Sequence, residues 1–132
     1  MRNFDNSTIQ LITAFENIAQ TEVRDCVCSD TIYFLVNPGK MARTIGKNGY
    51  NIKSAEKMLG RQIKVFEWSE DENQFIKNLI PKVQKVEIKD GKCTVSLSSE
   101  NRGSIIGKKG SNIKVLRILL ERNSSIKDLK VL

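Results

Sequence analysis

Apolar residues recur along the chain at two spacings, and the two spacings alternate in a regular order. Near the N-terminus an apolar stripe at helical spacing predicts a first helix, with Ser7 and Gln10 as its capping box. The stripe consists of Leu11, Ala14, Phe15 and Ile18. Two short apolar runs, at residues 23–28 and 31–36, then predict a pair of β-strands.

An Asn-Pro-Gly break at residues 37–39 ends this pair of strands. Beyond it, the pattern predicts a short helix to Ile45 and a turn at residues 46–49. A longer helix to Leu59 and a closing strand at residues 63–66 follow. The first half of the chain therefore has the predicted order αββααβ.

The second half has the same order. Ser69 and Glu72 form a second potential capping box, and Pro81 ends the helix that follows it. Two alternating runs flank Asp90-Gly91, which is a strong signal for a β-hairpin. The remaining predicted elements are a short helix from about Arg102, a turn at 107–110, a helix to about Arg122 and a strand near 129–132.

The two halves also resemble each other residue by residue. Residues 45–59 align without gaps on residues 106–120, at an offset of 61, and eight of the 15 aligned positions are identical. We therefore predict two copies of one unit, with domains at residues 1–68 and 69–132. The fold class is α+β, and each domain is expected to have a three-stranded sheet with helices packed on one face.

Each copy contains a G-x-x-G turn between two helices. Glycine allows positive φ and lets a ligand backbone approach closely, and the N-terminus of the next helix favours an anion. Lys47, Lys108 and Lys109 add positive charge at the turns. The turns are therefore predicted to bind phosphate, although a G-x-x-G turn would also serve merely to join two helices.

The residues after the turns argue against nucleotide chemistry. A Walker loop requires Gly-Lys followed by Ser or Thr, but Asn48 and Lys109 stand at these positions, and no dinucleotide G-x-G-x-x-G is present. The chain has no histidine, so it has no Ser-His or Cys-His pair and no histidine metal ligand. We expect no catalytic residues, no metal and no cofactor; a nucleotide-dependent enzyme is the less favoured alternative.

The charge of the chain is concentrated around the two turns. The formal net charge is +7. Residues 40–57 and 102–122 together contain 11 bases and two acids, whereas the other 93 residues contain 11 bases and 13 acids. A positive charge focused in this way indicates a polymeric phosphate ligand, that is, a nucleic acid.

Composition limits the remaining choices. With 39% hydrophobic residues and no run of about 20 apolar residues, the chain is expected to fold without a membrane. The N-terminus has no apolar segment of the secretory kind, so a cytoplasmic location is expected. Cys26, Cys28 and Cys93 are expected to be buried and reduced, with the first two on one face of a strand.

The repeated segments resemble the KH signature, in which a GXXG loop holds about four nucleotides. The matching segments are Ile45-Gly46-x-x-Gly49-x-x-Ile52 and Ile106-Gly107-x-x-Gly110-x-x-Ile113. The order αββααβ resembles the type II KH fold. Two such domains joined directly, together with the run Arg24-Asp25-Cys26, resemble the archaeal NusA-like transcription factors. The resemblance implies a protein that binds single-stranded RNA, with RNA polymerase or a transcription complex as a further partner. We also expect the protein to be a monomer.

The turns, the basic residues that flank them and the resemblance together define the candidate RNA-binding residues. These are Arg43, Ile45, Gly46, Lys47, Asn48, Gly49, Lys53, Arg102, Ile106, Gly107, Lys108, Lys109, Gly110 and Lys114.

Several roles stay open at this point. Ile52 and Ile113 are assigned to the core rather than to base contacts, and Lys53, Lys114 and Arg117 would contact either phosphate or water. Tyr50 is the one aromatic residue placed to touch a base. Type II KH folds also serve in ribosomes and rRNA processing, so a ribosome-associated role is the alternative within RNA binding.

Overall fold

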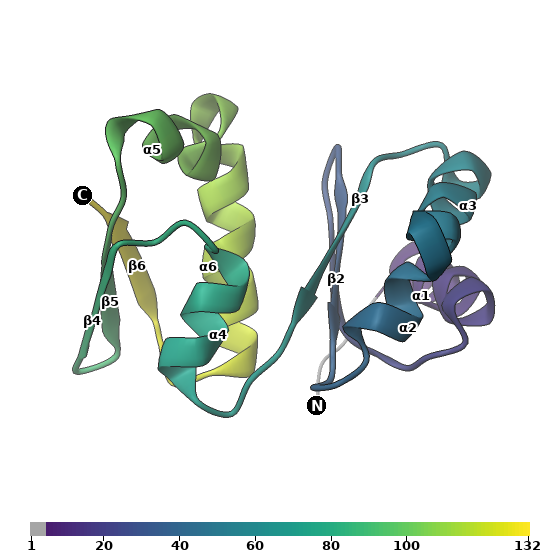
Figure 1. Ribbon diagram of the computed structural model, residues 1–132, viewed down its shortest axis with the longest axis horizontal. Helices are drawn as coiled ribbons and strands as arrows, with labels where there is room; N and C mark the ends of the chain where they lie inside the picture. Colours follow the sequence, from purple (N-terminus) through teal and green to yellow (C-terminus); the bar gives the residue numbers. More distant parts are fainter. Residues whose placement is uncertain (1–4) are drawn as a thin grey trace. The chain divides into compact units, whose positions relative to one another are not determined.

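A computed structural model of the chain describes residues 5–132 (Figure 1). Residues 1–4, which begin the expected first domain and the N-terminal segment considered for a signal, lie outside the described residues. The chain divides into two compact units, and the boundary along the chain lies between Trp68 and Ser69.

The first unit runs through three helices, one short 3-10 turn and three strands. Its elements are α1 (Asn6–Ala19), β1 (Val23–Cys28), β2 (Ile32–Val36), α2 (Met41–Ile45), η1 (Lys47–Gly49), α3 (Tyr50–Leu59) and β3 (Ile63–Glu67). The second unit repeats this order. Its elements are α4 (Glu72–Leu79), β4 (Lys85–Lys89), β5 (Lys92–Ser96), α5 (Ser99–Ile106), η2 (Lys108–Gly110), α6 (Ser111–Asn123) and β6 (Asp128–Val131).

The two sheets have the same topology. In the first, β1 pairs with β2 antiparallel and β2 pairs with β3 parallel; in the second, β4, β5 and β6 pair in the same way. The helices of each unit lie on one face of its own sheet (Figure 1). The predicted α+β class and the predicted order αββααβ, with a three-stranded sheet in each copy, are therefore confirmed.

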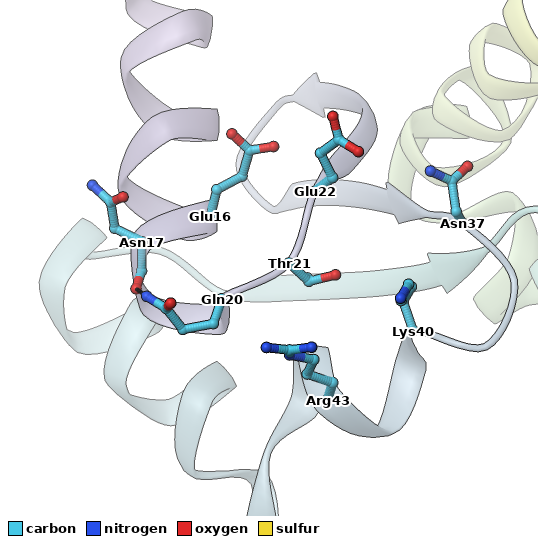
Figure 2. A pocket seen from close by; sticks show the side chains of 8 residues that line it. All are labelled: Glu16, Asn17, Gln20, Thr21, Glu22, Asn37, Lys40 and Arg43. Carbon is cyan, nitrogen blue, oxygen red and sulfur yellow. Dashed lines mark hydrogen bonds between the residues drawn. The ribbon is translucent and has the colours of Figure 1, made fainter.

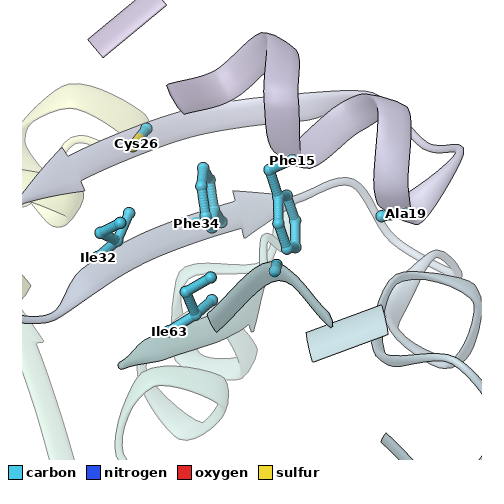
Figure 3. Packing of buried hydrophobic residues seen from close by; sticks show 7 residues of the cluster. Phe15, Ala19, Cys26, Ile32, Phe34 and Ile63 are labelled. Carbon is cyan, nitrogen blue, oxygen red and sulfur yellow. The ribbon is translucent and has the colours of Figure 1, made fainter. Parts of the chain in front are cut away.

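The core of the first unit lies between α1 and the sheet. Phe15 from α1 stacks on Phe34 from β2, with ring centroids 4.0 Å apart and planes 7° from parallel (Figure 3). Ile32 and Cys26 extend this cluster along the sheet, and Ile63 brings in the edge strand. Because these side chains come from α1 and all three strands, their burial fixes how the helix lies on the sheet.

The predicted capping boxes are wrong. Asp5, not Ser7, is the N-cap of α1, and its Oδ1 accepts the N–H of Thr8 at 2.7 Å. Asp71, not Ser69, is the N-cap of α4. The hydrogen bonds from Thr8 also hold the pKa of Asp5 below its ordinary value. In both places an aspartate competes with a nearby serine, and a carboxylate is the stronger acceptor at a positive helix end.

The second hairpin is as predicted, and the short helix after it begins earlier than predicted. Asp90 and Gly91 connect β4 to β5 with φ of +52° and +77°, which is the two-residue turn that such a pair favours. α5 begins at Ser99, three residues before Arg102; its N-cap residue, Ser98, is extended and makes no side-chain capping hydrogen bond. The apolar pattern did not reveal this earlier start, because the first residues of α5, Ser99 to Asn101, are polar.

The three cysteines do not share one environment. None of them forms a disulfide; Cys26 and Cys93 are buried as expected, but Cys28 is exposed, so its predicted burial is wrong. The Sγ atoms of Cys26 and Cys28 lie 3.9 Å apart, which confirms that they share a face of β1. Cys28 is exposed because it is the last residue of β1, where the strand leaves the covered part of the sheet.

Replacing Phe15 should destabilise the first unit strongly. Phe15 has no exposed surface, so Phe15→Ala leaves a cavity against Phe34 and should lower the free energy of unfolding by about 3–4 kcal/mol. The matched control on the same helix is Ile9→Ala: Ile9 is 47% exposed, and its loss should cost less than about 0.5 kcal/mol. Urea denaturation followed by circular dichroism measures both, and equal losses would contradict this account of the core.

Alkylation should distinguish the cysteines. Burial, with the charge of Glu72 as a second cause, raises the pKa of the Cys93 thiol to about 11. At pH 8 Cys93 therefore stays protonated and covered, and Cys28 should react first with iodoacetamide. The folded protein is alkylated and then digested, and mass spectrometry of the peptides gives the order in which the cysteines are modified. Rapid modification of Cys93 without denaturant would contradict this prediction.

Candidate nucleic-acid interface

The two G-x-x-G turns have the same backbone conformation. Gly46 has φ, ψ of 80°, 168° and Gly107 has 77°, 173°. Two residues further on, Asn48 and Lys109 both lie in the left-handed region, at 56°, 27° and 56°, 28°. The sequence repeat is therefore also a repeat of backbone geometry.

An asparagine in each following helix holds the turn closed. Asn51 Nδ2 donates to the carbonyl of Arg43 at 3.0 Å, and Asn112 Nδ2 donates to the carbonyl of Ser104 at 2.8 Å. Each amide thus joins the start of the second helix to the end of the first, eight residues back. A Cβ atom on Gly46 would lie 2.8 Å from Asn51 Cγ, so the glycine makes this close approach possible.

The sequence pattern did not reveal the role of the two asparagines. The aligned pair Asn51 and Asn112 is one of the eight identical positions of the repeat. This identity was the signal in the sequence that could have pointed to a shared role. Their hydrogen-bond partners across the turn depend on the folded geometry, so spacing alone could not assign them.

The helices that follow the turns begin without side-chain caps. α3 starts after Gly49 and α6 after Gly110, and neither glycine supplies a capping side chain; α2 and α5 also lack a side-chain cap, whereas Asp5 and Asp71 cap α1 and α4. The first N–H groups of a helix have no acceptor within it, and its dipole favours negative charge there. These two helix starts thus suit an anion, and the exposed Lys47, Asn48, Lys108 and Lys109 surround them.

A groove of about 330 Å³ adjoins the first turn. It lies between the start of α3 and the edge strand β3, and most of its lining is apolar. The lining residues are Ile45, Gly49, Ile52, Lys53, Glu56, Ile63 and Val65. Ile52 also packs against the core cluster, so it serves both the core and the groove.

The structure separates Arg43 from the other candidates in the first unit. Ile45, Gly49 and Lys53 meet in the groove, but Arg43 lines a different, polar pocket of about 520 Å³ (Figure 2). That pocket also contains Lys40 together with two acids, so its charges balance. The residues around it are Glu16, Asn17, Gln20, Thr21, Glu22, Asn37, Lys40 and Arg43.

Among the candidates of the second unit, Ile106 and Lys114 match Ile45 and Lys53 at the offset of 61, whereas Ser104 stands at the place of Arg43. Arg102 is exposed on α5, and Ile106 is the half-buried last residue of that helix. Lys114 is exposed in the first turn of α6, while Ile113 is buried in the core, as expected from the sequence. Tyr50, directly after the first turn, is 69% exposed, and Ser111 stands at the corresponding place in the second unit.

Two other kinds of site are absent from residues 5–132. No group of three His, Cys, Asp or Glu side chains is placed there to hold a metal ion. In that same part of the chain, no helix has the length and apolar character needed to cross a membrane.

The chain contains two GXXG turns of the same backbone geometry, each followed by a helix without a side-chain cap and surrounded by basic residues. Together these features define an RNA-binding protein of the KH type. Comparison with known families agrees, because residues 10–87 and 72–131 each match the family described as "KH domain". The chain belongs to the KH domain family.

Archaeal proteins resemble the chain over nearly its whole length. A protein of Methanocaldococcus jannaschii named "Probable transcription termination protein NusA" is 31% identical over 131 residues, covering 94% of this chain and 72% of that protein. A protein of the same name from Thermoplasma acidophilum is 32% identical, covering 96% of this chain and 93% of that protein. Within the KH family this chain is therefore NusA-like, as the sequence resemblance implied.

A solved structure has the same fold. The structure titled "Crystal structure of APE1850" is 28% identical to this chain, with a TM-score of 0.73. The match covers 94% of this chain and 96% of that one.

Alanine in place of three glycines should have three different effects. At Gly107 a Cβ would lie 2.8 Å from the backbone N of Asn112, in a φ, ψ region that only glycine populates, so Gly107→Ala should cost about 2–3 kcal/mol. At Gly110 the nearest atom is 3.7 Å away, so Gly110→Ala should cost only the left-handed conformation, about 1 kcal/mol.

Gly103 provides the internal control for this series. It lies inside α5, and a Cβ added to it would have nothing within 4 Å, so Gly103→Ala should stabilise the chain by about 0.5–1 kcal/mol. Urea denaturation gives the free energy of unfolding for all three variants. Equal costs at Gly107 and Gly110 would show that the close approach to Asn112 is not the constraint.

Proposed function

We propose that the chain binds single-stranded RNA through its two GXXG turns and acts on nascent transcripts as a NusA-like factor. The observation that carries the proposal is the duplicated turn: two uncapped helix starts of one backbone geometry, each with lysines beside it. An RNA backbone offers phosphates at regular spacing, and a glycine turn lets that backbone approach closely.

In this proposal phosphates bind at the turns and bases enter the neighbouring grooves. Lys47, Asn48, Lys108 and Lys109 hold the phosphates, beside the positive ends of α3 and α6. Ile45 and Lys53 line the first groove, with Ile106 and Lys114 at the corresponding places in the second unit. Arg43 and Arg102, exposed on the helices before the turns, contact the flanking phosphates.

The two turns should differ in the strength of phosphate binding. The first turn has one lysine and an asparagine between its glycines, whereas the second has two lysines. Each phosphate held by a cation releases counterions, so the second turn is expected to contribute more of the affinity and more of its salt dependence.

The proposal extends to the domains and partners. Residues 1–68 and 69–132 each form one RNA-binding domain, and one RNA strand engages both turns. The protein works in the cytoplasm as a monomer, as a binding factor rather than an enzyme, with the transcription complex or RNA polymerase as its protein partner. The names of the archaeal relatives support a role in transcription termination.

Reversing the charge at each turn should weaken RNA binding. Lys108→Asp with Lys109→Asp should lower the affinity for random single-stranded RNA by roughly a hundredfold, and Lys47→Asp with Asn48→Asp by roughly tenfold, because charge-assisted contacts to phosphate are lost. Fluorescence anisotropy across a salt series measures both the affinity and the slope. The slope should become shallower by about 0.7 for each phosphate contact removed.

The control changes the same charge elsewhere in the second unit. Lys89→Asp with Lys92→Asp alters the residues beside the β4–β5 hairpin turn, at the other end of the sheet from η2 (Figure 1). RNA affinity should change by less than about threefold there, because these lysines lie away from the bound phosphates. Loss of affinity equal to that of the turn variants would mean that net charge alone governs binding, and the turns would not be the site.

Two experiments test the proposed protein partner and the proposed absence of enzymatic activity. Affinity purification from cells should recover RNA polymerase subunits; recovery of ribosomal subunits instead would favour the ribosome-associated alternative. Turnover of ATP or GTP by the pure protein would contradict a purely binding role.

A further inference from the structure

The two RNA-facing surfaces have one matched position of opposite charge. The offset of 61 that aligns the turns also pairs Glu56 of α3 with Arg117 of α6. Close by, both copies carry a lysine at the same place, since Lys53 pairs with Lys114. The two copies therefore differ here by one side chain, which is acidic in the first copy and basic in the second. It lies one helical turn beyond the lysine that both copies share.

Glu56 lies in the first groove and is fixed by the edge strand. Its Oε2 accepts the backbone N–H of Ile63 at 2.9 Å, and the side chain lines the groove together with Ile45 and Val65. Among residues 5–132, Oε1 of Glu56 has no hydrogen-bond donor. The first groove therefore presents a fixed carboxylate oxygen that accepts hydrogen bonds.

Arg117 is fixed at the corresponding strand of the second unit, by the opposite backbone group. Its Nε and Nη2 donate to the carbonyl of Leu129 at 3.2 and 2.9 Å, and Asp128 Oδ1 lies 4.0 Å from Nε. Leu129 pairs with Cys93 in β5, as Ile63 pairs with Ile32 in β2, so the two anchoring residues correspond.

The anchored guanidinium keeps one edge available. The Nε–Nη2 edge binds Leu129, and Nη1 has no acceptor among the described residues 5–132. The side chain is 47% exposed. The Nη1–Nη2 edge thus presents two parallel N–H groups, a pair that matches the O6 and N7 acceptors of guanine.

We propose that Glu56 and Arg117 make the two surfaces select different bases. The carboxylate of Glu56 selects a base with an exocyclic amino group, cytosine or adenine, in the first groove. The outer edge of Arg117 selects guanine at the second unit. This inference rests on the proposed function, because it assigns base preference to the same two RNA-binding surfaces.

The test isolates one surface at a time within the full chain. Lys47→Asp with Asn48→Asp disables the first turn and leaves the second surface; Lys108→Asp with Lys109→Asp does the reverse. The probes are short fluorescent oligouridylates that carry one central guanine, adenine or cytosine. The second surface should prefer the guanine probe by roughly tenfold, and the first should prefer the cytosine or adenine probe by a similar factor.

Conservative variants then assign the preference to the two side chains. Arg117→Gln should remove the guanine preference, and Arg117→Lys should remove it as well, because an ammonium keeps the charge and a donor for Leu129 but not the paired edge. Glu56→Gln should remove the preference of the first surface, while its amide oxygen still accepts the N–H of Ile63. Lys57→Gln on α3 and Glu121→Gln on α6 are the controls for single charge changes on the same helices, and both should keep the wild-type preferences.

The possible results separate the two hypotheses. Equal affinity of both isolated surfaces for all probes would overturn the inference while leaving RNA binding intact. A guanine preference that survives in Arg117→Lys would also overturn it, because charge alone would then suffice. Failure of the unmodified chain to bind any of the probes would instead contradict the proposed function.

Discussion

The close approach between the first glycine of each turn and the asparagine five residues later is the constraint on which the interface depends. Without a Cβ at Gly46, Asn51 reaches the last turn of α2 and its amide joins the two helices. This contact joins the start of α3 to the end of α2, so the direction in which α3 leaves the turn is fixed. The same distances recur at Gly107, which explains why two copies with many different residues keep one backbone.

In the proposed function, this arrangement assigns phosphate and base recognition to different parts of each unit. In that proposal, phosphate binding depends on the turn and its few lysines, which the backbone geometry of the turn holds in place. The groove depends on side chains from a helix and an edge strand, and these can change without altering the turn. Glu56 and Arg117 illustrate this freedom: each is anchored to the edge strand, one through an N–H and the other through a carbonyl.

The sequence predicted the elements of the fold and the turns because both depend on local patterns. Apolar periodicity, the repeat and the glycine spacing are properties of the linear chain. Predictions failed where two nearby residues competed, as Ser7 did with Asp5 at the start of α1, since both types can cap a helix. They also failed where exposure depended on a strand end, at Cys28. Such outcomes depend on three-dimensional packing that spacing does not encode.

Lys109 has a backbone conformation that disfavours lysine. Its φ of +56° is the conformation that asparagine, the residue at the same place in the first copy, tolerates better than lysine does. A side chain chosen for stability alone would not be lysine here. The second turn thus retains a conformationally unfavourable residue that adds one positive charge, so the two copies differ in the intrinsic stability of the turn and in the charge beside it.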